Sequence, residues 1–536
     1  MALKKIVYLV LLAPLVFSTA WGQKSGLSPE FHKEKRQQFR EKMPANSVAV
    51  FFSSPIRNRA NDVDFVYHQD PNFYYLTGWE EPHAVLLIYK TAQKDEAGSY
   101  SEKIYVRERN AYNEMWNGKR KGVAGASNMG FERVVERSLF KAESHAFDSF
   151  DEVLFFNFKN DIRNFNNDEH DLYDLQKTFK EKINFPENFN VQRYALYQQI
   201  KKVAPENRAE LKEQIEQYVK QDEALKEDAF IQSFLASETN NTTELQQSTQ
   251  LQMAPNNYNV TGLGRIMAEL REIKTKEEVA LIKKAVRISA QGQIEVMKAL
   301  HPNMTEREVQ GIHQLVFKKY GAAHEGYPSI VGAGDNACVL HYITNDKTEI
   351  DNQLILMDLG AEYNGYTADV TRTVPVTGKF TEPQRELYEI VYASQQAGIE
   401  AARVGGDFKA ITKACYDVVK EGLLALGLID KPEDFRRYLP HGVAHHIGLD
   451  VHDPGLYETL AENMIITVEP GIYVPKNSPC DPKYWDIGIR IEDDVLITKD
   501  GPITLSDEAP RAWQEIEALM AKASALDDFV LPEIND

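Results

Sequence analysis

The chain has 536 residues, of which 43% are hydrophobic and 26% charged, and its mean hydropathy is -0.44. This apolar content is enough for two sizeable folded domains and excludes a disordered chain. The 80 acidic residues outnumber the 61 lysines and arginines, and the net charge of -19 argues against nucleic acid as a partner. The three cysteines, Cys338, Cys415 and Cys480, have no spacing typical of zinc sites or disulfide frameworks.

Residues 1–22 form a predicted export signal. Lys4 and Lys5 precede an apolar run over 6–17, and small residues lead up to a cleavage point expected after Gly22. The alternative is an uncleaved anchor, but the apolar run is shorter than the roughly 20 residues of a membrane span. No later segment is long and apolar enough to span a bilayer. We therefore expect an exported protein, periplasmic or secreted, without a stable membrane anchor.

Residues 23–256 are predicted to form a first, α/β domain. Short β-like runs, such as those at 48–52 and 84–88, alternate with charged helical stretches. The segment 157–174 is rich in Asn, Asp and Phe without clear periodicity, so it is expected to be a surface excursion of this domain.

A second domain is predicted over residues 257–525, with a C-terminal tail at 526–536. The stretch 237–261 is rich in Thr, Asn and Gln, which indicates a polar connection and a domain boundary near Asn257. Helix starts are then predicted by three capping-box patterns, which begin at Thr275, Thr305 and Thr381.

An Asn-Gly pair at 364–365 predicts a tight hairpin between strands over 354–359 and 366–373. Counting back from this turn along both strands places Asp358 opposite Thr371.

Asp369 is then diagonal to Asp358 on the same face of the hairpin. Diagonal neighbours have Cβ atoms about 7 Å apart, close enough for two carboxylates to converge on one cation. Two buried carboxylates without a cation would be costly, so the pair predicts a metal site that needs further ligands.

Further candidate ligands occur downstream. Four of the 13 histidines lie within a short stretch: His441, His445, His446 and His452. Glu469 ends an apolar strand just before a Pro-Gly turn, and Arg490 and Glu492 share one face of another strand. Imidazole can serve as a metal ligand, a proton shuttle or an oxyanion donor, and an isolated histidine cluster could equally be a polar loop.

The order and sequence context of these residues resemble the dinuclear metallopeptidases of the pita-bread fold, and most closely the aminopeptidase P family. The motifs that carry the resemblance are Met357-Asp358-Leu359-Gly360, the run 368–373, Val468-Glu469-Pro470-Gly471 and the run 490–494. The segment 70–82 is similar to the N-terminal domain of the same family. The resemblance implies a creatinase-like α/β domain followed by a pita-bread catalytic domain.

The resemblance also implies the ligand set. Asp369 and Glu492 would bridge or span two metals, Asp358 would complete one site, and His445 with Glu469 would complete the other. Oxygen-rich ligation with one imidazole favours two Mn2+ ions, although zinc or cobalt could occupy the site in vitro. A hydroxide held between the ions would then be the nucleophile of a hydrolysis.

Other roles follow from the same resemblance. His341 and His452 would contact the substrate and stabilise the tetrahedral intermediate, and Glu469 would also shuttle a proton to the leaving nitrogen. We expect Arg490 to orient Glu492, and Tyr473 and His441 to lie beside the metals or the substrate.

The expected activity is removal of the N-terminal residue from peptides with proline at position two. The alternatives are a prolidase, which acts on Xaa-Pro dipeptides, and a non-catalytic pita-bread module that binds peptides. Because members of this family commonly let the first domain of one subunit close the site of another, we also expect a homo-oligomer, a dimer or a tetramer. Trp116 is the candidate closing residue, with an ordinary half-buried tryptophan as the alternative.

Overall fold

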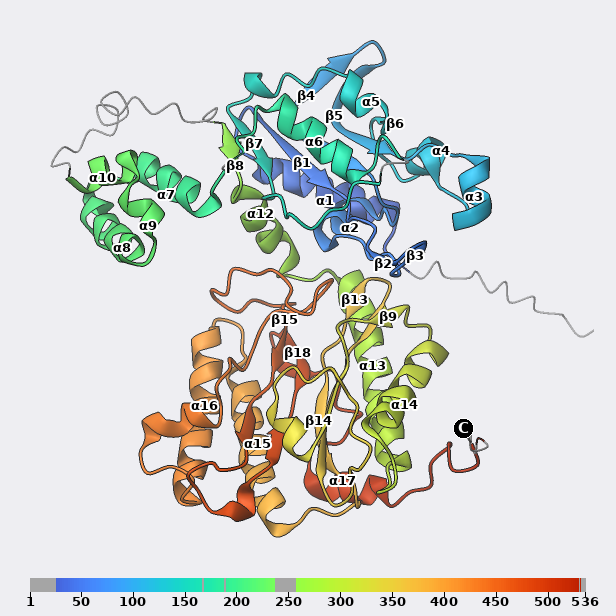
Figure 1. The fold of residues 1–536 in the computed structure, drawn as a ribbon, viewed down its shortest axis with the longest axis vertical. Helices are drawn as coiled ribbons and strands as arrows, with labels where there is room; N and C mark the ends of the chain where they lie inside the picture. The colour runs from blue at the N-terminus through green and yellow to red at the C-terminus, as the bar shows by residue number, and fades with distance from the viewer. Residues whose placement is uncertain (1–25, 166–167, 188, 237–256, 530, 532–536) are drawn as a thin grey trace, which may run out of the picture.

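The structure is a computed structural model that describes residues 26–165, 168–187, 189–236, 257–529 and 531. Two bodies, the first and second domains, are stacked along the long axis of the molecule (Figure 1). The expected export signal and residues 237–256 of the expected polar connection lie outside the described residues. Within the described residues, no helix combines the length and the apolarity needed to cross a bilayer.

The first domain is built on a mixed six-stranded sheet. Its strands are β1 (Ser47–Phe52), β4 (Val85–Asp95), β5 (Gly98–Val106), β6 (Val134–Glu136), β7 (Glu152–Phe155) and β8 (Tyr258–Asn259), in the spatial order β6-β5-β4-β1-β7-β8. Its helices are α1 (Pro29–Lys42), α2 (Pro71–Thr77), α3 (Ala111–Asn117), α4 (Gly122–Ser127), α5 (Leu139–Ala142) and α6 (Leu172–Lys182), and a small hairpin pairs β2 (Asn58–Ala60) with β3 (Val63–Asp64). The predicted α/β character is confirmed, and both predicted strand runs lie in the sheet.

The boundary expected near Asn257 is too early. The main chain at Tyr258 and Asn259 pairs with β7 of the first sheet, and α12 (Gly262–Arg271) packs against α1. The Tyr75 hydroxyl also donates to the carbonyl of Leu270, at 2.7 Å. The first domain therefore includes residues that follow the polar connection, because their partners are non-local.

A helical unit beside the first domain was not predicted. It consists of α7 (Val191–Lys202), α8 (Arg208–Gln221), α9 (Glu223–Lys226) and α10 (Ala229–Ala236) (Figure 1). These helices bury a core of their own, which includes Ile200, Ile215, Phe230 and Phe234. The expected excursion at 157–174 is only partly correct, since its end begins α6 and Leu172 is buried.

The second domain places long helices around a set of small sheets. The helices are α13 (Lys276–Ala299), α14 (Glu306–Lys319), α15 (Glu382–Ala401), α16 (Phe408–Ala425) and α17 (Trp513–Met520). In Figure 1, α13 and α14 lie on one side of the strands and α15 and α16 on the other. All three predicted capping boxes are present, at α13, α14 and α15.

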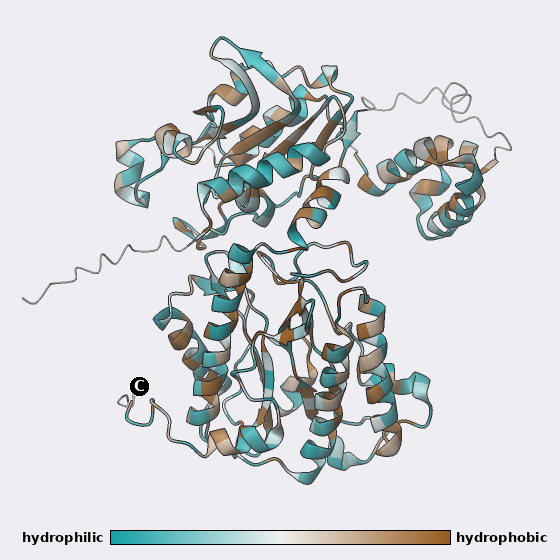
Figure 2. Ribbon diagram, turned by 180° about the vertical axis from the view of Figure 1, so that it is seen from behind, coloured by the Kyte–Doolittle hydropathy of each residue, from teal (hydrophilic) through white to brown (hydrophobic). Residues whose placement is uncertain are grey.

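The hydrophobic core of the domain lies between these helices and the strands, and its apolar residues are brown in Figure 2. One sheet has the order β10 (Ile330–Ala333), β11 (Leu354–Asp358), β14 (Thr371–Pro375), and a second has β13 (Tyr366–Thr367), β12 (Ala361–Tyr363), β9 (His324–Glu325). A third has β15 (Ile465–Val468), β18 (Asp493–Thr498), β19 (Gly501–Thr504), and β16 (Gly471–Val474) pairs with β17 (Ile487–Arg490).

The predicted hairpin has the expected register, with Asp358 opposite Thr371. Its strands are nevertheless interrupted, because the chains approach closely at Gly360, where an added Cβ would meet the carbonyl oxygen of Ala368 at 1.7 Å. The strand expected over 366–373 therefore divides into β13 and β14. Asp369 lies in the interruption, where its N–H group donates to the Asp494 carboxylate at 3.0 Å.

Candidate metal centre

The five predicted ligands converge on one cavity of about 580 Å³ in the second domain. Asp358 ends β11, Asp369 precedes β14, Glu469 follows β15, and Glu492 lies between β17 and β18. His445 comes from the loop before β15. Four strand ends and one loop, distant in sequence, thus supply the cavity with four carboxylates and an imidazole.

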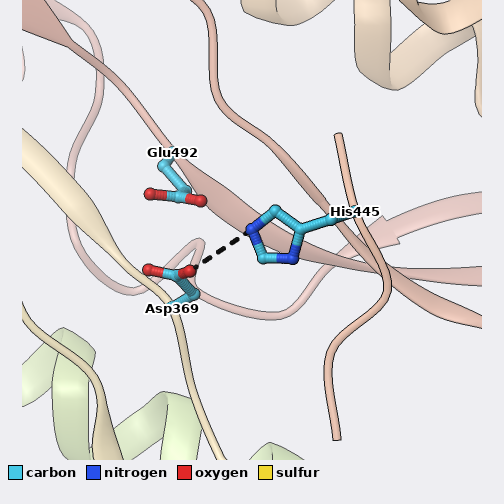
Figure 3. A group of neighbouring side chains, drawn as sticks. All are labelled: Asp369, His445 and Glu492. Carbon is cyan, nitrogen blue, oxygen red and sulfur yellow. Dashed lines mark ion pairs between the residues drawn. The ribbon is translucent and has the colours of Figure 1, made fainter. Parts of the chain in front are cut away.

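Asp369, His445 and Glu492 form the centre of this group, with one potential ligand atom of each within 4.8 Å of the others (Figure 3). His445 Nε2 lies 3.6 Å from Asp369 Oδ2 and 3.5 Å from Glu469 Oε1. Asp358 is connected through Tyr327, whose hydroxyl lies 2.5 Å from Oδ1 of both Asp358 and Asp369. The predicted diagonal pair is therefore close enough to share one cation.

Burial and neighbouring negative charge raise the pKa of three carboxylates of this group, Asp369, Glu469 and Glu492. Burial, together with repulsion from Glu492 and Asp358, holds the pKa of Asp369 well above its usual range. Burial and the charge of Glu492 do the same for Glu469, and burial with the charge of Asp358 raises the pKa of Glu492 to about 8. Glu492 Oε1 is also buried without a hydrogen-bond partner. Divalent cations would remove both penalties, so the residues fit a metal centre.

His445 is prepared to act as a neutral ligand. Burial is the main cause that lowers its pKa to about 4, so the ring is uncharged at neutral pH. Nδ1 lies 3.0 Å from the carbonyl oxygen of His446, which can only accept, so Nδ1 carries the proton. Nε2, which faces Asp369 and Glu469, is left with a free lone pair for a cation.

The structure corrects the role expected for Arg490. Its guanidinium donates to Asp358 Oδ2 at 2.5 Å and to the Tyr473 hydroxyl at 2.9 Å, and so orients Asp358. Glu492 is oriented instead by the Thr371 hydroxyl, at 2.7 Å. Counting residues along one strand shows which side chains share a face, but it does not show which side chain of another sheet each one contacts. For this reason the pairing of Arg490 with Asp358 was not predicted.

Tyr473 and His441 continue the same network. The Tyr473 hydroxyl accepts from Arg490 and donates to His441 Nε2, at 2.9 Å. Burial is the main cause that lowers the pKa of His441 to about 4, so His441 is neutral and can accept this bond. His441 Nδ1 lies 3.8 Å from Glu469 Oε2, whereas Tyr473 reaches Asp358 only through Arg490.

His341 and His452 line the cavity and are exposed within it. The ring of His452 lies 4.4 Å from the ring of His445, edge to face, so it borders the metal ligands. Trp116 lies apart from this cavity, on α3, with 69% of its surface exposed. The half-buried alternative is therefore wrong, and the closing of another subunit's cavity by Trp116 stays a prediction.

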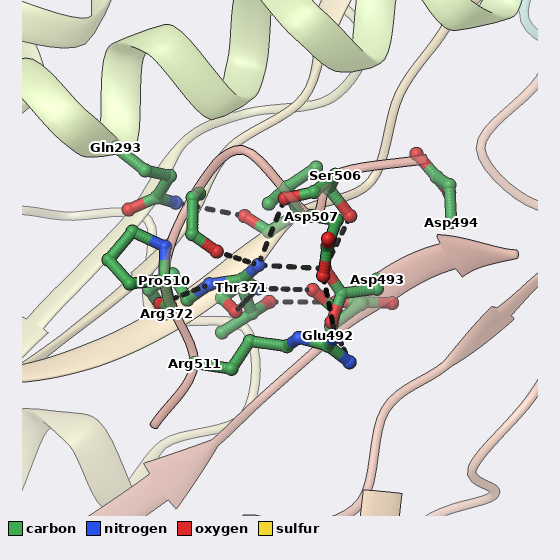
Figure 4. Close-up of polar contacts among 12 residues, drawn as sticks. Gln293, Thr371, Arg372, Glu492, Asp493, Asp494, Ser506, Asp507, Pro510 and Arg511 are labelled. Carbon is green, nitrogen blue, oxygen red and sulfur yellow. Dashed lines mark hydrogen bonds and ion pairs between the residues drawn. The ribbon is translucent and has the colours of Figure 1, made fainter. Parts of the chain in front are cut away.

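Two groups of supporting residues were missed from the sequence. Tyr327 lies in a loop with no periodic pattern, so no local signal indicates that it links Asp358 to Asp369. Behind Glu492, the buried Arg372 donates to the carbonyl of Glu492 at 2.7 Å and to the Asp493 carboxylate at 2.7 Å (Figure 4). This pairing fixes the strand end that carries Glu492.

Comparisons with known proteins agree with this geometry. Residues 280–499 match the profile of metallopeptidase family M24, and residues 32–147 match the aminopeptidase P N-terminal domain. The chain is 30% identical over 517 residues to the Xaa-Pro aminopeptidase of Escherichia coli, covering 93% of this chain and 99% of that protein. It is 31% identical over 506 residues to the Xaa-Pro aminopeptidase of Haemophilus influenzae, covering 92% and 98%.

A solved structure of Escherichia coli aminopeptidase P with the inhibitor Pro-Leu superposes with a TM-score of 0.72 at 28% identity, covering 92% of this chain and 99% of that one. Fold and site thus define a metallopeptidase of family M24 with the pita-bread architecture. Because the likeness extends over both domains, the chain belongs to the aminopeptidase P family.

Proposed function

We propose that this protein is a metallo-aminopeptidase that hydrolyses the bond between an N-terminal residue and a following proline. The observation that carries the proposal is the convergence of Asp358, Asp369, His445, Glu469 and Glu492 on one cavity. The family supports the reaction class, and the relatives' names support the Xaa-Pro substrate. A non-catalytic peptide-binding module would have no use for a complete ligand set.

The proposed cofactor is a pair of divalent ions, with Mn2+ favoured by four carboxylates and a single imidazole. Asp369 and Glu492 would lie between the ions, Asp358 would complete one site, and His445 and Glu469 the other. When bound, such ions activate water as a nucleophile near neutral pH and polarise the scissile carbonyl.

The chain's own residues supply the remaining steps. Glu469, whose pKa is raised by burial and by Glu492, is suited to receive a proton from the nucleophile and to pass it to the leaving nitrogen. His341 and His452, exposed in the cavity, are placed to donate to the carbonyl oxygen as negative charge develops there. Arg490 holds Asp358 in place, and Tyr473, which accepts from Arg490, holds His441.

The cavity favours an aminopeptidase over a prolidase. A dipeptide's terminal carboxylate would need a cation beside proline, and Arg490 is the one lysine or arginine among the described residues that line the cavity. It is already paired with Asp358. Between His452 and Glu469, residues 454–463 contain no Lys or Arg and do not line the cavity. The site can therefore extend past proline.

The test compares kcat/KM for an Xaa-Pro-Yaa tripeptide with that for the matching Xaa-Pro dipeptide, with the same metal and the same first residue. We expect the tripeptide to be better by about tenfold or more, a difference of ~1.4 kcal/mol in transition-state binding. A preference for the dipeptide would instead identify a prolidase.

Export and assembly are further parts of the proposal. The sequence of residues 1–22 supports removal of an export signal, which N-terminal sequencing of the mature protein would test. Tyr112, Met115 and Trp116, each 68% to 69% exposed on α3, support a contact with another subunit in a dimer or tetramer. A fully active monomer in sedimentation would remove the oligomer from the proposal.

A further inference from the structure

Glu306 is a fully buried carboxylate at the start of α14, with a relative exposure of 0%, and it does not line the metal cavity. It accepts four hydrogen bonds: from Ala333 N–H at 2.8 Å, Asn336 Nδ2 at 3.0 Å, the Tyr342 hydroxyl at 2.9 Å and Lys347 N–H at 2.9 Å. All four donors belong to one segment, 333–347. The helix start is joined to the same segment, since the N–H of Glu306 donates to the carbonyl of Lys347 at 3.1 Å.

This segment carries His341 into the cavity. From residue 339 to residue 347 it has no helix or strand, and Val339 is the last residue before His341 with a backbone hydrogen bond, to Asn336. Among the described residues, no hydrogen bond holds the His341 ring. The position of the ring is therefore set by the two ends of the loop and by the packing of Leu340 and Tyr342 against the apolar cluster that includes Ile330 and Ala337.

Glu306 fastens both of those ends. One oxygen accepts from the incoming end, at Ala333 and Asn336, and the other accepts from the outgoing end, at Tyr342 and Lys347. Tyr342 is the residue directly after His341. The uncharged side chain of Asn345 also holds the outgoing end, because it accepts from the N–H of Val331 and donates to the carbonyl of Ser329.

A carboxylate placed only to stabilise the start of α14 would not need burial. Glu308, two residues later, completes the capping box while it remains exposed. Burying a charge is costly unless hydrogen bonds replace its water, and bonds to a charged acceptor are among the strongest in proteins. The four hydrogen bonds that Glu306 accepts from the two ends of the His341 loop offset this cost of burial.

We propose that Glu306 is a positioning residue that holds His341 at the wall of the active-site cavity. The inference rests on the proposed function, in which His341 contacts the substrate. Glu306 itself touches neither the substrate nor the metal ligands. Its effect on the reaction passes through the loop 333–347 and therefore depends on His341.

The test is a double-mutant cycle between Glu306→Gln and His341→Ala. The glutamine keeps the shape but replaces one acceptor oxygen by an amide group, which cannot accept from the main-chain N–H that it then faces, that of Ala333 or that of Lys347. For an Xaa-Pro-Yaa peptide we expect Glu306→Gln to lower kcat/KM at least about tenfold when His341 is present, since small misplacements of reacting groups have large effects. In the His341→Ala background the same change should cost less than about twofold, with metal content unchanged in both.

Glu308→Gln is the matched control on the same helix, because glutamine also completes a capping box and should leave kcat/KM unchanged. An equal loss in both His341 backgrounds would assign Glu306 a general structural role and overturn the proposal, as would full activity of Glu306→Gln. If that variant does not fold, Tyr342→Phe removes the hydroxyl that bonds Glu306 and, within the loop, Asp346, and should show the same dependence on His341.

Hydrogen exchange separates this inference from the proposed function, because it needs no substrate. Glu306→Gln should speed amide exchange within 333–347, and Glu308→Gln should not. Unchanged exchange in this segment would overturn the positioning role. Lack of turnover by the wild-type protein on Xaa-Pro-Yaa peptides, with the exchange result as expected, would count against the proposed function and leave the loop contact established.

Discussion

Two adjacent buried carboxylates, Glu492 and Asp493, have opposite surroundings. Asp493 accepts from Arg372 and Ser506 on one oxygen, and Arg511 lies 3.5 Å away from the other (Figure 4). That second oxygen also accepts from Gln395. Glu492 faces the cavity, where one oxygen has no partner. The protein balances the charge of Asp493 with its own groups and leaves that of Glu492 for cations. Asp493, whose charge is paired, thus belongs to the structural scaffold of the second domain, whereas Glu492, whose charge is not, belongs to the candidate metal centre.

Removing a charge on the metal side should affect activity most. Asp369→Asn keeps the volume but weakens the group that lies between both predicted metal positions. Metal content and kcat should fall together, by more than the roughly 10–100-fold that changes around a ligand typically cost. Metal analysis and kinetics on the purified variant check this, and a fully active Asp369→Asn protein would contradict the assigned centre.

Removing a charge on the scaffold side should instead affect stability. Asp493→Asn removes the negative charge paired with the buried Arg372, whose other partners are main-chain carbonyls, and breaking such an ion pair costs about 3–5 kcal/mol in the free energy of unfolding. The loss should appear in denaturant unfolding with or without a chelator. Glu492→Gln is the matched comparison: it should raise the stability of the metal-stripped protein and reduce the stabilisation that added metal gives. Equal behaviour of the two variants would remove the contrast between these neighbours.

The histidines of the cavity should affect turnover without affecting metal. His452→Ala is expected to lower kcat with metal content nearly intact, by ~3 kcal/mol if it resembles the loss of one oxyanion donor. Steady-state kinetics and metal analysis on the same preparation give the answer. A loss of bound metal would make His452 a ligand.

The pH dependence of the metal-stripped protein should show the smallest effect. The pKa of Glu492 is raised from 4.5 to about 8, so the folded chain binds more protons than the unfolded chain between these values. The stability from this group is therefore fully present below pH 4.5 and is lost as the pH rises through about 8. Thermal unfolding after chelation should show a steeper slope in the wild type than in Glu492→Gln, in which the raised pKa values of Asp369 and Glu469 still contribute.

The sequence points to the candidate ligands through local patterns and through the family resemblance, which selects His445 from the histidine cluster. An acid at the end of an apolar strand indicates Glu469, and the Asn-Gly turn fixes the register that brings Asp358 beside Asp369. Partners that come from distant elements have no such pattern. The pairing of Arg490 with Asp358, the Tyr327 link and the grip of Glu306 on the His341 loop all depend on how separate sheets and helices pack.

The fold shows the same limit. Strands such as β1 and β4 were predicted from apolar runs, whereas the helical unit α7–α10 was not, because no local pattern indicates that these helices pack on one another around a separate core. The early domain boundary has a related cause. Tyr258 and Asn259 follow a polar stretch and become part of the first domain only by pairing with β7.

We propose that Glu492 and its neighbouring carboxylates, whose negative charge the protein's own groups leave unbalanced, hold two divalent ions that catalysis requires. Titrating chelator-treated protein with Mn2+ tests this directly, with cleavage of an Xaa-Pro-Yaa peptide and the melting temperature followed together. We predict that activity and thermal stability return in parallel and saturate at about two equivalents of metal. Full activity before any metal is added, or activity that does not respond to metal, would contradict the account.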